Sequence, residues 1–385
     1  MEFFYRCTEC DRQFEIGPDL MVCPDCAKRQ VADRPLRGVL EVGFTGTRTS
    51  NWPASGTYGE LLPIEERFFP PVPVGNTPLW QPTNLREKLG LARLFLKDET
   101  ANPTESLKDR ASALVAACAN KYGITDVVVA STGNAASSMA GIGAAAGLNV
   151  KIFVPKTAPR AKLIQSLQYG ADVTLVDGPY DDAVTQSLEF TRSNKGLNRN
   201  TGYNPMTIEG KKTAALEIFA QLGRIPDVVY VPTGDGVILG GIYKGFEDIV
   251  ALGLADHMPA VVAVQAEGSN AICRALKLDG FTEPVNGDTI ADSISVGVPA
   301  NGQSAVAKLR KHRGRCVEVS DVEILDAQIE LSSVSGLFAE PAAAAALAGL
   351  RKELDTVPPE STIVLLITGS GLKDIDAAGR RVRVP

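Results

Sequence analysis

Short apolar runs recur along the chain and alternate with longer stretches of helical character. The runs are LFLKDE (94–99), VVVAST (127–132), VKIFVP (150–155), DVTLVDG (172–178), VVYVPTG (228–234), VVAVQAEG (261–268) and TIVLLITGSG (362–371). The helical stretches between them include Ser106–Tyr122, Ala135–Gly147, Pro159–Tyr169 and Gly210–Gly223. Buried strands separated by helices are typical of parallel sheets covered by helices on both faces, so the pattern predicts an α/β fold.

Three of the turns that follow these strands combine glycine with Ser, Thr, Asn or Asp: VVVASTGNAAS, VVYVPTGDGVILGG and LLITGSGLKD. Ligands of parallel α/β folds bind where strand ends meet helix starts, and backbone N–H groups there attract anions. One such loop often serves only packing. Three of them in one chain, with Lys108 at the start of a fourth helix in ETANPTESLKDRAS (99–112), predict a ligand site.

Composition and charge narrow the class of protein. The 385 residues are 44% hydrophobic and 22% charged, which is typical of a globular protein large enough for two domains. The net charge of −6 gives no support to a nucleic-acid or anionic-membrane surface, and no apolar run is long enough to span a bilayer. The start, MEFFYRCTEC, lacks the features of a signal peptide, so we expect a cytoplasmic protein.

The histidines and cysteines limit the chemistry further. The two histidines, His257 and His312, lie in no motif, which argues against a histidine triad or a histidine-rich catalytic metal site. Four of the seven cysteines form C-T-E-C and C-P-D-C, namely Cys7, Cys10, Cys23 and Cys26. Two such knuckles can direct four thiolates at a structural Zn²⁺; the alternative is a knuckle that has lost its metal. The other three, Cys118, Cys273 and Cys316, are expected to be isolated thiols.

Two segments, NPTESLKDR (102–110) and IEGKKTAALEI (208–218), are similar to the motifs N-P-T-G-S-F-K-D-R and I/L-E-G-Q-K-T-x-A-x-E. These motifs belong to the fold type II pyridoxal-phosphate enzymes of the tryptophan synthase β-like superfamily. Among them, the sequence resembles the threonine synthase group. Further similar segments are GNTPL (75–79), STGN (131–134), VPTGDGVILGGIYKGF (231–246), GLFAEPAAAA (336–345) and ITGSGLKD (367–374). The resemblance extends from about Leu61 to Asp374.

The resemblance implies two three-layer, doubly wound domains with mostly parallel sheets, in addition to the cysteine module. The division we expect is a zinc-ribbon-like module with four cysteines (1–32), an extended arm with the start of the large cofactor domain (33–97), a small substrate-binding domain (98–205), and the remainder of the large domain (206–385).

The resemblance also assigns roles to residues. Lys108 would bind pyridoxal phosphate covalently and act as the base; the alternative is a solvated lysine at a helix start. Asn134 would hydrogen-bond the phenolic oxygen of the cofactor, and Thr368 would face its pyridine nitrogen. The phosphate would be held by the backbone of Gly234, Asp235, Gly236, Val237 and Ile238. The substrate carboxylate would be held by Ser131, Thr132 and Gly133, together with Asn134; the alternative role for these residues is helix capping.

The expected substrate pocket departs from the family's pattern. The family's substrate is O-phosphohomoserine, and its phosphate pocket has Thr where this chain has Ala135 and Arg where it has Thr207. Asp235 replaces the Asn of the family's G-N-x-G-N loop, and Glu105 replaces a glycine. An arginine is suited to clamping phosphate. Nearby cations are expected to be mostly solvated: Arg110, Arg160, Lys162, Lys211 and Lys212.

The sequence therefore predicts a threonine synthase-like enzyme that eliminates or replaces a β- or γ-substituent on a small L-amino acid other than O-phosphohomoserine. The alternatives are threonine synthase itself, a serine or threonine dehydratase or β-replacement synthase, and a non-catalytic relative. We expect no nucleic-acid or membrane partner. A homodimer is expected because symmetric oligomers are common.

Overall fold

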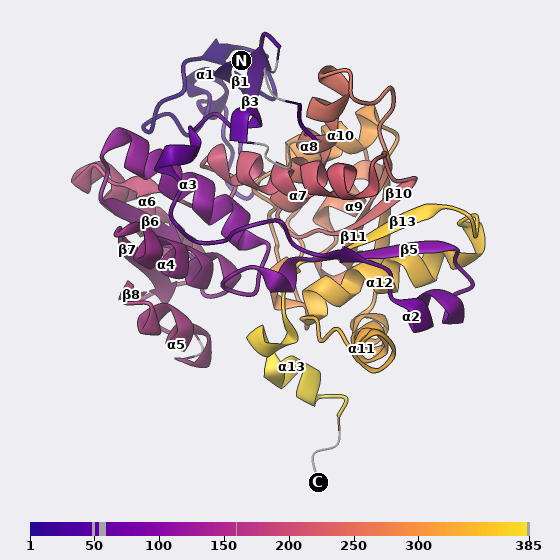
Figure 1. Ribbon diagram of the computed structural model, residues 1–385. Helices are drawn as coiled ribbons and strands as arrows, with labels where there is room; N and C mark the ends of the chain where they lie inside the picture. The colour runs from indigo at the N-terminus through magenta and orange to yellow at the C-terminus, as the bar shows by residue number, and fades with distance from the viewer. Residues whose placement is uncertain (48–50, 54–58, 159, 383–385) are drawn as a thin grey trace.

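The computed structural model describes residues 1–47, 51–53, 59–158 and 160–382 (Figure 1). The strands are β1 (Glu2–Cys7), β2 (Gln13–Phe14), β3 (Leu40–Thr45), β4 (Leu79–Trp80), β5 (Arg93–Asp98), β6 (Asp126–Ala130), β7 (Asn149–Pro155), β8 (Asp172–Val176), β9 (Leu197–Asn198), β10 (Val228–Pro232), β11 (Ala260–Ala266), β12 (Arg315–Val319) and β13 (Thr362–Ile367). Each of the seven predicted apolar runs overlaps a strand, to within one residue at its start.

Helices follow most of these strands. They are α1 (Pro24–Ala27), α2 (Thr83–Lys88), α3 (Lys108–Tyr122), α4 (Asn134–Ala146), α5 (Arg160–Gln168), α6 (Tyr180–Asn194), α7 (Met206–Leu222), α8 (Val237–Ala251), α9 (Ala271–Lys277), α10 (Gly302–Lys311), α11 (Asp321–Glu330), α12 (Pro341–Glu353) and α13 (Ile375–Gly379). The four predicted helices correspond to α3, α4, α5 and α7; Pro159, where one was expected to begin, lies outside the described residues.

The larger sheet has six strands in the order β12-β11-β10-β13-β5-β4, all parallel except the edge strand β4. Its side chains alternate between two cores. On β13, Leu365 belongs to the core that contains α12, whereas Val364 and Leu366 belong to the core that contains α7 and α8. Helices therefore cover both faces, as predicted for a buried parallel sheet.

The smaller sheet has four parallel strands in the order β8-β7-β6-β9. On β6, Val127 and Val129 pack in a core with α3 and α4, whereas Val128 lies in a separate core with Ala183 of α6. This sheet also has helices on both faces. The α/β class with parallel and mixed sheets is thus confirmed.

A third sheet lies at the N-terminus, where β1 pairs antiparallel with both β2 and β3. β3 falls in the stretch that the sequence predicted to be an extended arm, and it forms a six-residue strand beside β1. The four cysteines of the two knuckles lie at this sheet, with Cys7 at the end of β1 and Cys26 in α1.

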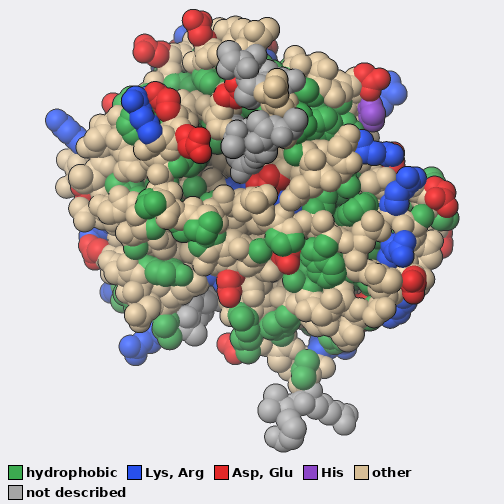
Figure 2. Space-filling model, viewed as in Figure 1, with side chains coloured by type: hydrophobic (Ala, Val, Ile, Leu, Met, Phe, Trp, Pro, Cys, Tyr) green, Lys and Arg blue, Asp and Glu red, His purple; other side chains and the backbone are tan. Residues whose placement is uncertain are grey.

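The prediction that Cys273 and Cys316 are isolated thiols is wrong, because the structure joins them in a disulfide. Cys118 is a buried free thiol. On the face drawn in Figure 2, lysine and arginine side chains are interspersed with aspartate and glutamate. Among the described residues, no helix is long and apolar enough to cross a membrane.

Candidate active site

The segment before Lys108 is fixed against the end of β13. The Leu107 N–H donates to the carbonyl of Thr368 at 2.9 Å, and the Ser370 N–H donates to the carbonyl of Glu105 at 3.1 Å. The buried Asp109 carboxylate accepts hydrogen bonds from the Thr104 N–H at 2.7 Å and from the Thr104 hydroxyl at 2.5 Å. These bonds hold the first turn of α3, and therefore Lys108, beside the end of β13.

Glu105 adopts a left-handed backbone conformation, with φ of +62°. Side chains with a Cβ are disfavoured there, whereas glycine is not. The family motif that this segment resembles has glycine at the same position. Glu105 is therefore a strained residue in the loop that carries Lys108.

The surroundings of Lys108 lower the pKa of its amine. Burial is the main cause that lowers its pKa below 10.5; Arg199 lowers it further, and the carboxylates of Asp235 and Glu340 act in the opposite direction. A lysine with a lowered pKa can act as a nucleophile or a base. The structure thus gives Lys108 the properties that its expected role requires.

Asn134 begins α4, and its amide donates to Glu340 Oε2 at 2.8 Å and to Ser293 Oγ at 3.1 Å. Among the described residues, the N–H groups of Thr132, Asn134 and Ala135 have no protein acceptor. Free amides at a helix start form a site for an anion such as a carboxylate. The loop 131–134 therefore has the donors for its expected role.

The loop between β10 and α8 offers a second set of free amides. Within the described part of the chain, the N–H groups of Gly234, Asp235, Gly236 and Ile238 have no protein acceptor. The Val237 N–H is already occupied, because it donates to Asp235 Oδ1 at 2.9 Å. Four free amides at the start of a 15-residue helix suit a phosphate group.

Glycine is required in this loop. A Cβ on Gly234 would lie 2.8 Å from the Cα of Ile294, and Gly236 has a positive φ of +83°. The backbone can therefore present its amides close to a ligand. We conclude that the residues present fit the cofactor that the sequence predicted.

The expected substrate pocket lacks the family's polar groups at two positions. Thr207 is fully buried, and its hydroxyl donates to the carbonyl of Asn204 at 2.7 Å. Ala135 is partly exposed and has no polar side chain.

The expectation that the nearby cations are solvated is wrong for three of the five. Arg110, Lys211 and Lys212 are at most 3% exposed, and Arg160 is exposed. Arg110 forms ion pairs with Glu99 at 2.6 Å and Glu217 at 2.7 Å, so it ties α3 to α7. The side chain of Lys162 lies outside the described part of the chain.

Three charged residues of the site were not predicted: Arg199, Lys211 and Glu340. Arg199 is fully buried, and burial lowers its pKa to about 10. Its Nη2 has no hydrogen-bond partner among the described residues. Burial also raises the pKa of Glu340. Glu340 lies in the GLFAEPAAAA motif and Lys211 lies in IEGKKT, so both motifs could have pointed to these residues as part of the site.

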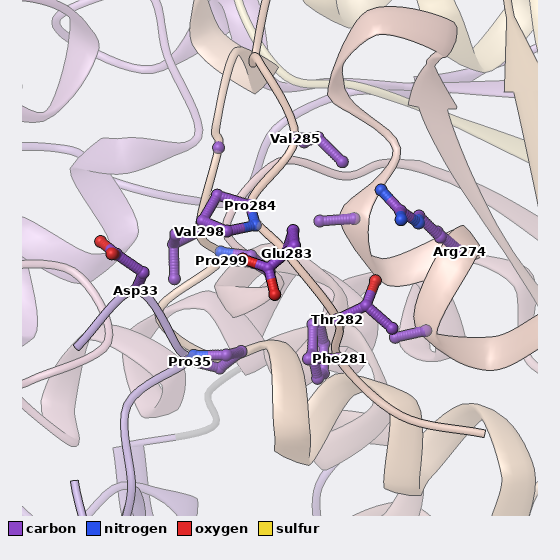
Figure 3. Close-up of a pocket in the computed structure, with 13 residues that line it drawn as sticks. Asp33, Pro35, Arg274, Phe281, Thr282, Glu283, Pro284, Val285, Val298 and Pro299 are labelled. Carbon is purple, nitrogen blue, oxygen red and sulfur yellow. The ribbon is translucent and has the colours of Figure 1, made fainter. Parts of the chain in front are cut away.

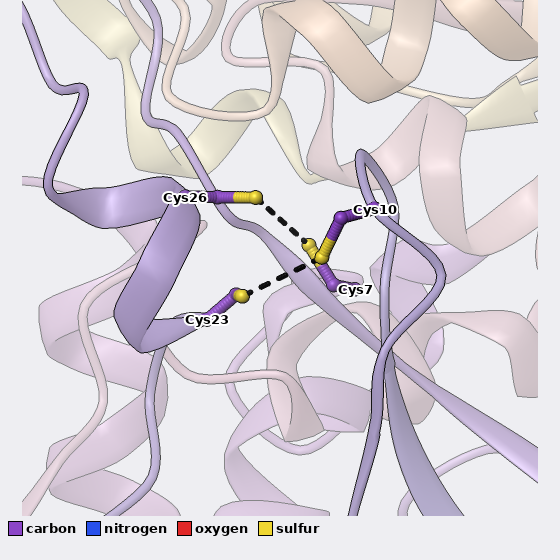
Figure 4. A group of neighbouring side chains, drawn as sticks. All are labelled: Cys7, Cys10, Cys23 and Cys26. Carbon is purple, nitrogen blue, oxygen red and sulfur yellow. Dashed lines mark hydrogen bonds between the residues drawn. The ribbon is translucent and has the colours of Figure 1, made fainter.

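The four knuckle cysteines converge (Figure 4). Their sulfur atoms all lie within 4.8 Å of one another, with Cys7 and Cys26 Sγ atoms 3.8 Å apart and Cys10 and Cys23 Sγ atoms 3.7 Å apart. Thiolates about 2.3 Å from a tetrahedral Zn²⁺ lie about 3.8 Å apart. The donor set therefore fits zinc in spacing and chemistry.

A separate hollow lies away from these residues, between the segment after the cysteine module and the loop 281–299 (Figure 3). Its lining includes Asp33, Pro35, Arg274 and Phe281, and it includes none of the predicted site residues.

An amine with a lowered pKa, an asparagine loop and an anion-binding helix start meet at the carboxyl ends of parallel strands. This arrangement defines an α/β enzyme that can hold a phosphorylated cofactor. The model of the family described as pyridoxal-phosphate dependent enzyme matches residues 72–369, and the chain belongs to this family.

Threonine synthases are similar to the chain over most of its length. That of Methanosarcina acetivorans is 34% identical over 388 residues, covering 97% of this chain and 92% of the relative. That of Mycobacterium tuberculosis H37Rv is 36% identical over 333 residues, covering 85% and 90%. These relatives are enzymes, and the chain is a threonine synthase-like, pyridoxal-phosphate-dependent enzyme of the lyase type.

Solved structures support the fold. Threonine deaminase isoform 2 from Solanum lycopersicum matches with a TM-score of 0.69 at 24% identity, covering 79% of this chain and 86% of that chain. Maize serine racemase matches with a TM-score of 0.69 at 21% identity, covering 80% and 91%.

Proposed function

We propose that the protein eliminates or replaces a substituent on the β- or γ-carbon of a small L-amino acid, and that its substrate is not O-phosphohomoserine. The placement of Lys108 carries the reaction class, because its amine is held at a helix start among Asp235, Glu340 and Arg199. When bound, pyridoxal phosphate supplies an electron sink for the negative charge that develops on the α-carbon.

The side chains have distinct tasks in this proposal. Lys108 holds the cofactor through its amine and, when free, takes the proton from the substrate's α-carbon. The free amides of Thr132, Asn134 and Ala135 bind the substrate carboxylate and so fix the α-carbon relative to Lys108. The free amides of the loop 234–238 hold the phosphate of the cofactor. The hydroxyl of Thr368 would contact the pyridine nitrogen without supplying charge.

Asn134 and Glu340 form a hydrogen-bonded pair, which would fix the side chain of Asn134 beside the phenolic oxygen of the bound cofactor. Burial raises the pKa of Glu340, whereas its hydrogen bond from Asn134 and the charge of Lys108 act in the opposite direction.

The change of substrate is supported by Thr207, Ala135 and Asp235. The Thr207 hydroxyl is committed to Asn204, Ala135 offers no side-chain donor, and Asp235 adds negative charge. A dianionic leaving group is poorly served by these residues. We therefore expect an uncharged or less anionic leaving group.

The test is a substrate panel on the purified protein loaded with cofactor. Serine, threonine, homoserine and their O-acylated and O-phosphorylated forms are compared by spectral shift, keto-acid release and product analysis. We expect turnover of a compound other than O-phosphohomoserine. Release of phosphate and formation of threonine from O-phosphohomoserine, faster than any other reaction in the panel, contradicts the proposed substrate change.

Threonine synthase activity is the second candidate, and one observation favours it. Arg199 places a fully buried guanidinium among the charges of the site, with Nη2 unbonded among the described residues. This guanidinium can hold phosphate where Thr207 cannot. Arg199→Lys then reduces turnover of O-phosphohomoserine through a raised KM, whereas it leaves an uncharged substrate unaffected.

We also propose that Cys7, Cys10, Cys23 and Cys26 hold a structural Zn²⁺. Four thiolates leave no open position, so this metal takes no part in catalysis. Metal analysis of the purified protein tests it: about one zinc per chain is expected, and a metal-free protein with four reactive thiols in this module contradicts it.

The homodimer, the cytoplasmic location and the division at residues 32, 97 and 205 remain predictions. Sedimentation of the purified protein tests the first of these.

A further inference from the structure

Lys211 is a buried lysine without a partner among the described residues. It is 0% exposed, and its Nζ makes no hydrogen bond to any of them. The next residue, Lys212, is equally buried, but its amine bonds Asp248 at 2.8 Å and also pairs with Glu209. An amine buried without an acceptor is costly. The contrast indicates that the acceptor for Lys211 is a ligand.

The position of Lys211 indicates where this ligand binds. α7 packs so closely on α8 that a Cβ on Gly241 would lie 2.7 Å from the Cβ of Lys211. Lys211 therefore stands beside the early turns of the helix whose preceding loop has free amides. Its pKa is lowered by burial and by the charges of Lys108 and Arg199, and raised by Asp235. These interactions place it among the groups of the site.

Asp235 explains why a cation is needed at this place. Its carboxylate is fixed by the Val237 N–H and lies in the loop proposed to hold the cofactor phosphate. A carboxylate next to a phosphate is unfavourable unless a positive charge offsets it. The resembled motifs have neutral Gln and Asn at positions 211 and 235. In this chain both positions carry ionisable side chains, a lysine and an aspartate.

We propose that Lys211 binds the phosphate of the cofactor and offsets the negative charge of Asp235. The proposal rests on the proposed placement of the phosphate at the loop 234–238. It adds a side-chain cation to a site otherwise made of backbone amides. It also gives a physical reason for the two departures from the resembled motifs.

The experiment compares pyridoxal phosphate with pyridoxal, which lacks the phosphate. Dissociation constants of both compounds are measured by absorbance on the full-length apoprotein for the wild type, Lys211→Gln, Lys211→Arg and the control Lys156→Gln. Lys156 is exposed and lies outside the site. Circular dichroism checks the folding of each variant.

We expect Lys211→Gln to weaken pyridoxal phosphate binding about tenfold or more, and pyridoxal binding by less than about twofold. Lys211→Arg retains the preference for the phosphorylated compound, and Lys156→Gln changes neither constant. Equal weakening of both compounds, or no change in either, overturns the proposal. Because the ratio of the two constants is used, a loss of folded protein does not imitate the expected result.

A double-mutant cycle tests the offset. Asp235→Asn in the wild type tightens binding of pyridoxal phosphate, and in the Lys211→Gln background it recovers part of the lost affinity. Independent effects of the two substitutions contradict the proposed offset. A wild-type protein that binds neither compound refutes the proposed function itself, which is a result distinct from a failure of Lys211 alone.

Discussion

The strained backbone of Glu105 leads to a quantitative prediction. Its φ of +62° places a residue with a Cβ in the left-handed region. This conformation costs about 1–2 kcal/mol relative to a right-handed one, whereas glycine adopts it freely. Glycine also increases the entropy of the unfolded chain, which costs about 0.5–1 kcal/mol. The balance predicts that Glu105→Gly stabilises the apoprotein by about 0.5–1 kcal/mol.

The assay is the midpoint of urea unfolding for the wild type, Glu105→Gly and the matched control Glu105→Ala. The alanine variant removes the carboxylate but keeps the Cβ, so we expect its stability to lie within about 0.5 kcal/mol of the wild type. If the alanine variant gains as much as the glycine variant, the gain comes from removing charge. That result, or a glycine variant less stable than the wild type, refutes the argument from strain.

Three further predictions concern buried charge and metal. Lys211 has a lowered pKa in the folded protein, whereas its amine is protonated in the unfolded chain at neutral pH. Burying Lys211 therefore lowers the free energy of unfolding at neutral pH. This loss disappears as the pH rises toward 10.5, because the unfolded chain then also loses the proton. Lys211→Met should therefore stabilise the apoprotein at pH 7 by an amount that shrinks toward pH 10.5; a gain that grows with pH in urea titrations contradicts this sign. Arg110→Met removes the ion-pair partner of two buried glutamates and should lower the free energy of unfolding by about 3–5 kcal/mol in the same assay. The control Arg67→Met, at an exposed arginine, should lower it by less than about 0.5 kcal/mol. Cys10→Ser should lower the zinc content and the thermal midpoint together, whereas Cys118→Ser should leave the zinc content unchanged; equal zinc content in both variants would argue against the four-cysteine site.

The apolar runs predicted the strands well because buried parallel strands need continuous hydrophobic sequence. Val228–Pro232 and Thr362–Ile367 are buried at every position. β3 was missed because its sequence, LEVGFT, lies in a stretch rich in glycine and proline, and its pairing with β1 is a contact between distant segments.

The residues of the site also divide into those that local sequence indicates and those that depend on contacts between distant segments. Lys108, Asn134 and the loop 234–238 could be found because local motifs carry them. The burial of Arg199 and Lys211 could not be found locally, since it depends on how β9 and α7 pack against the rest of the chain. The disulfide between Cys273 and Cys316, 43 residues apart, likewise depends on α9 packing near β12.

The central claim is that Lys108 holds the cofactor. The most direct measurement is borohydride reduction of the protein loaded with pyridoxal phosphate, followed by mass spectrometry of its peptides, for the wild type and Lys108→Ala. We predict that the wild type has a visible absorption band and a reduced cofactor on Lys108, and that Lys108→Ala has neither. A label on Lys211 in the wild type, or a visible band that persists in Lys108→Ala, would contradict the account.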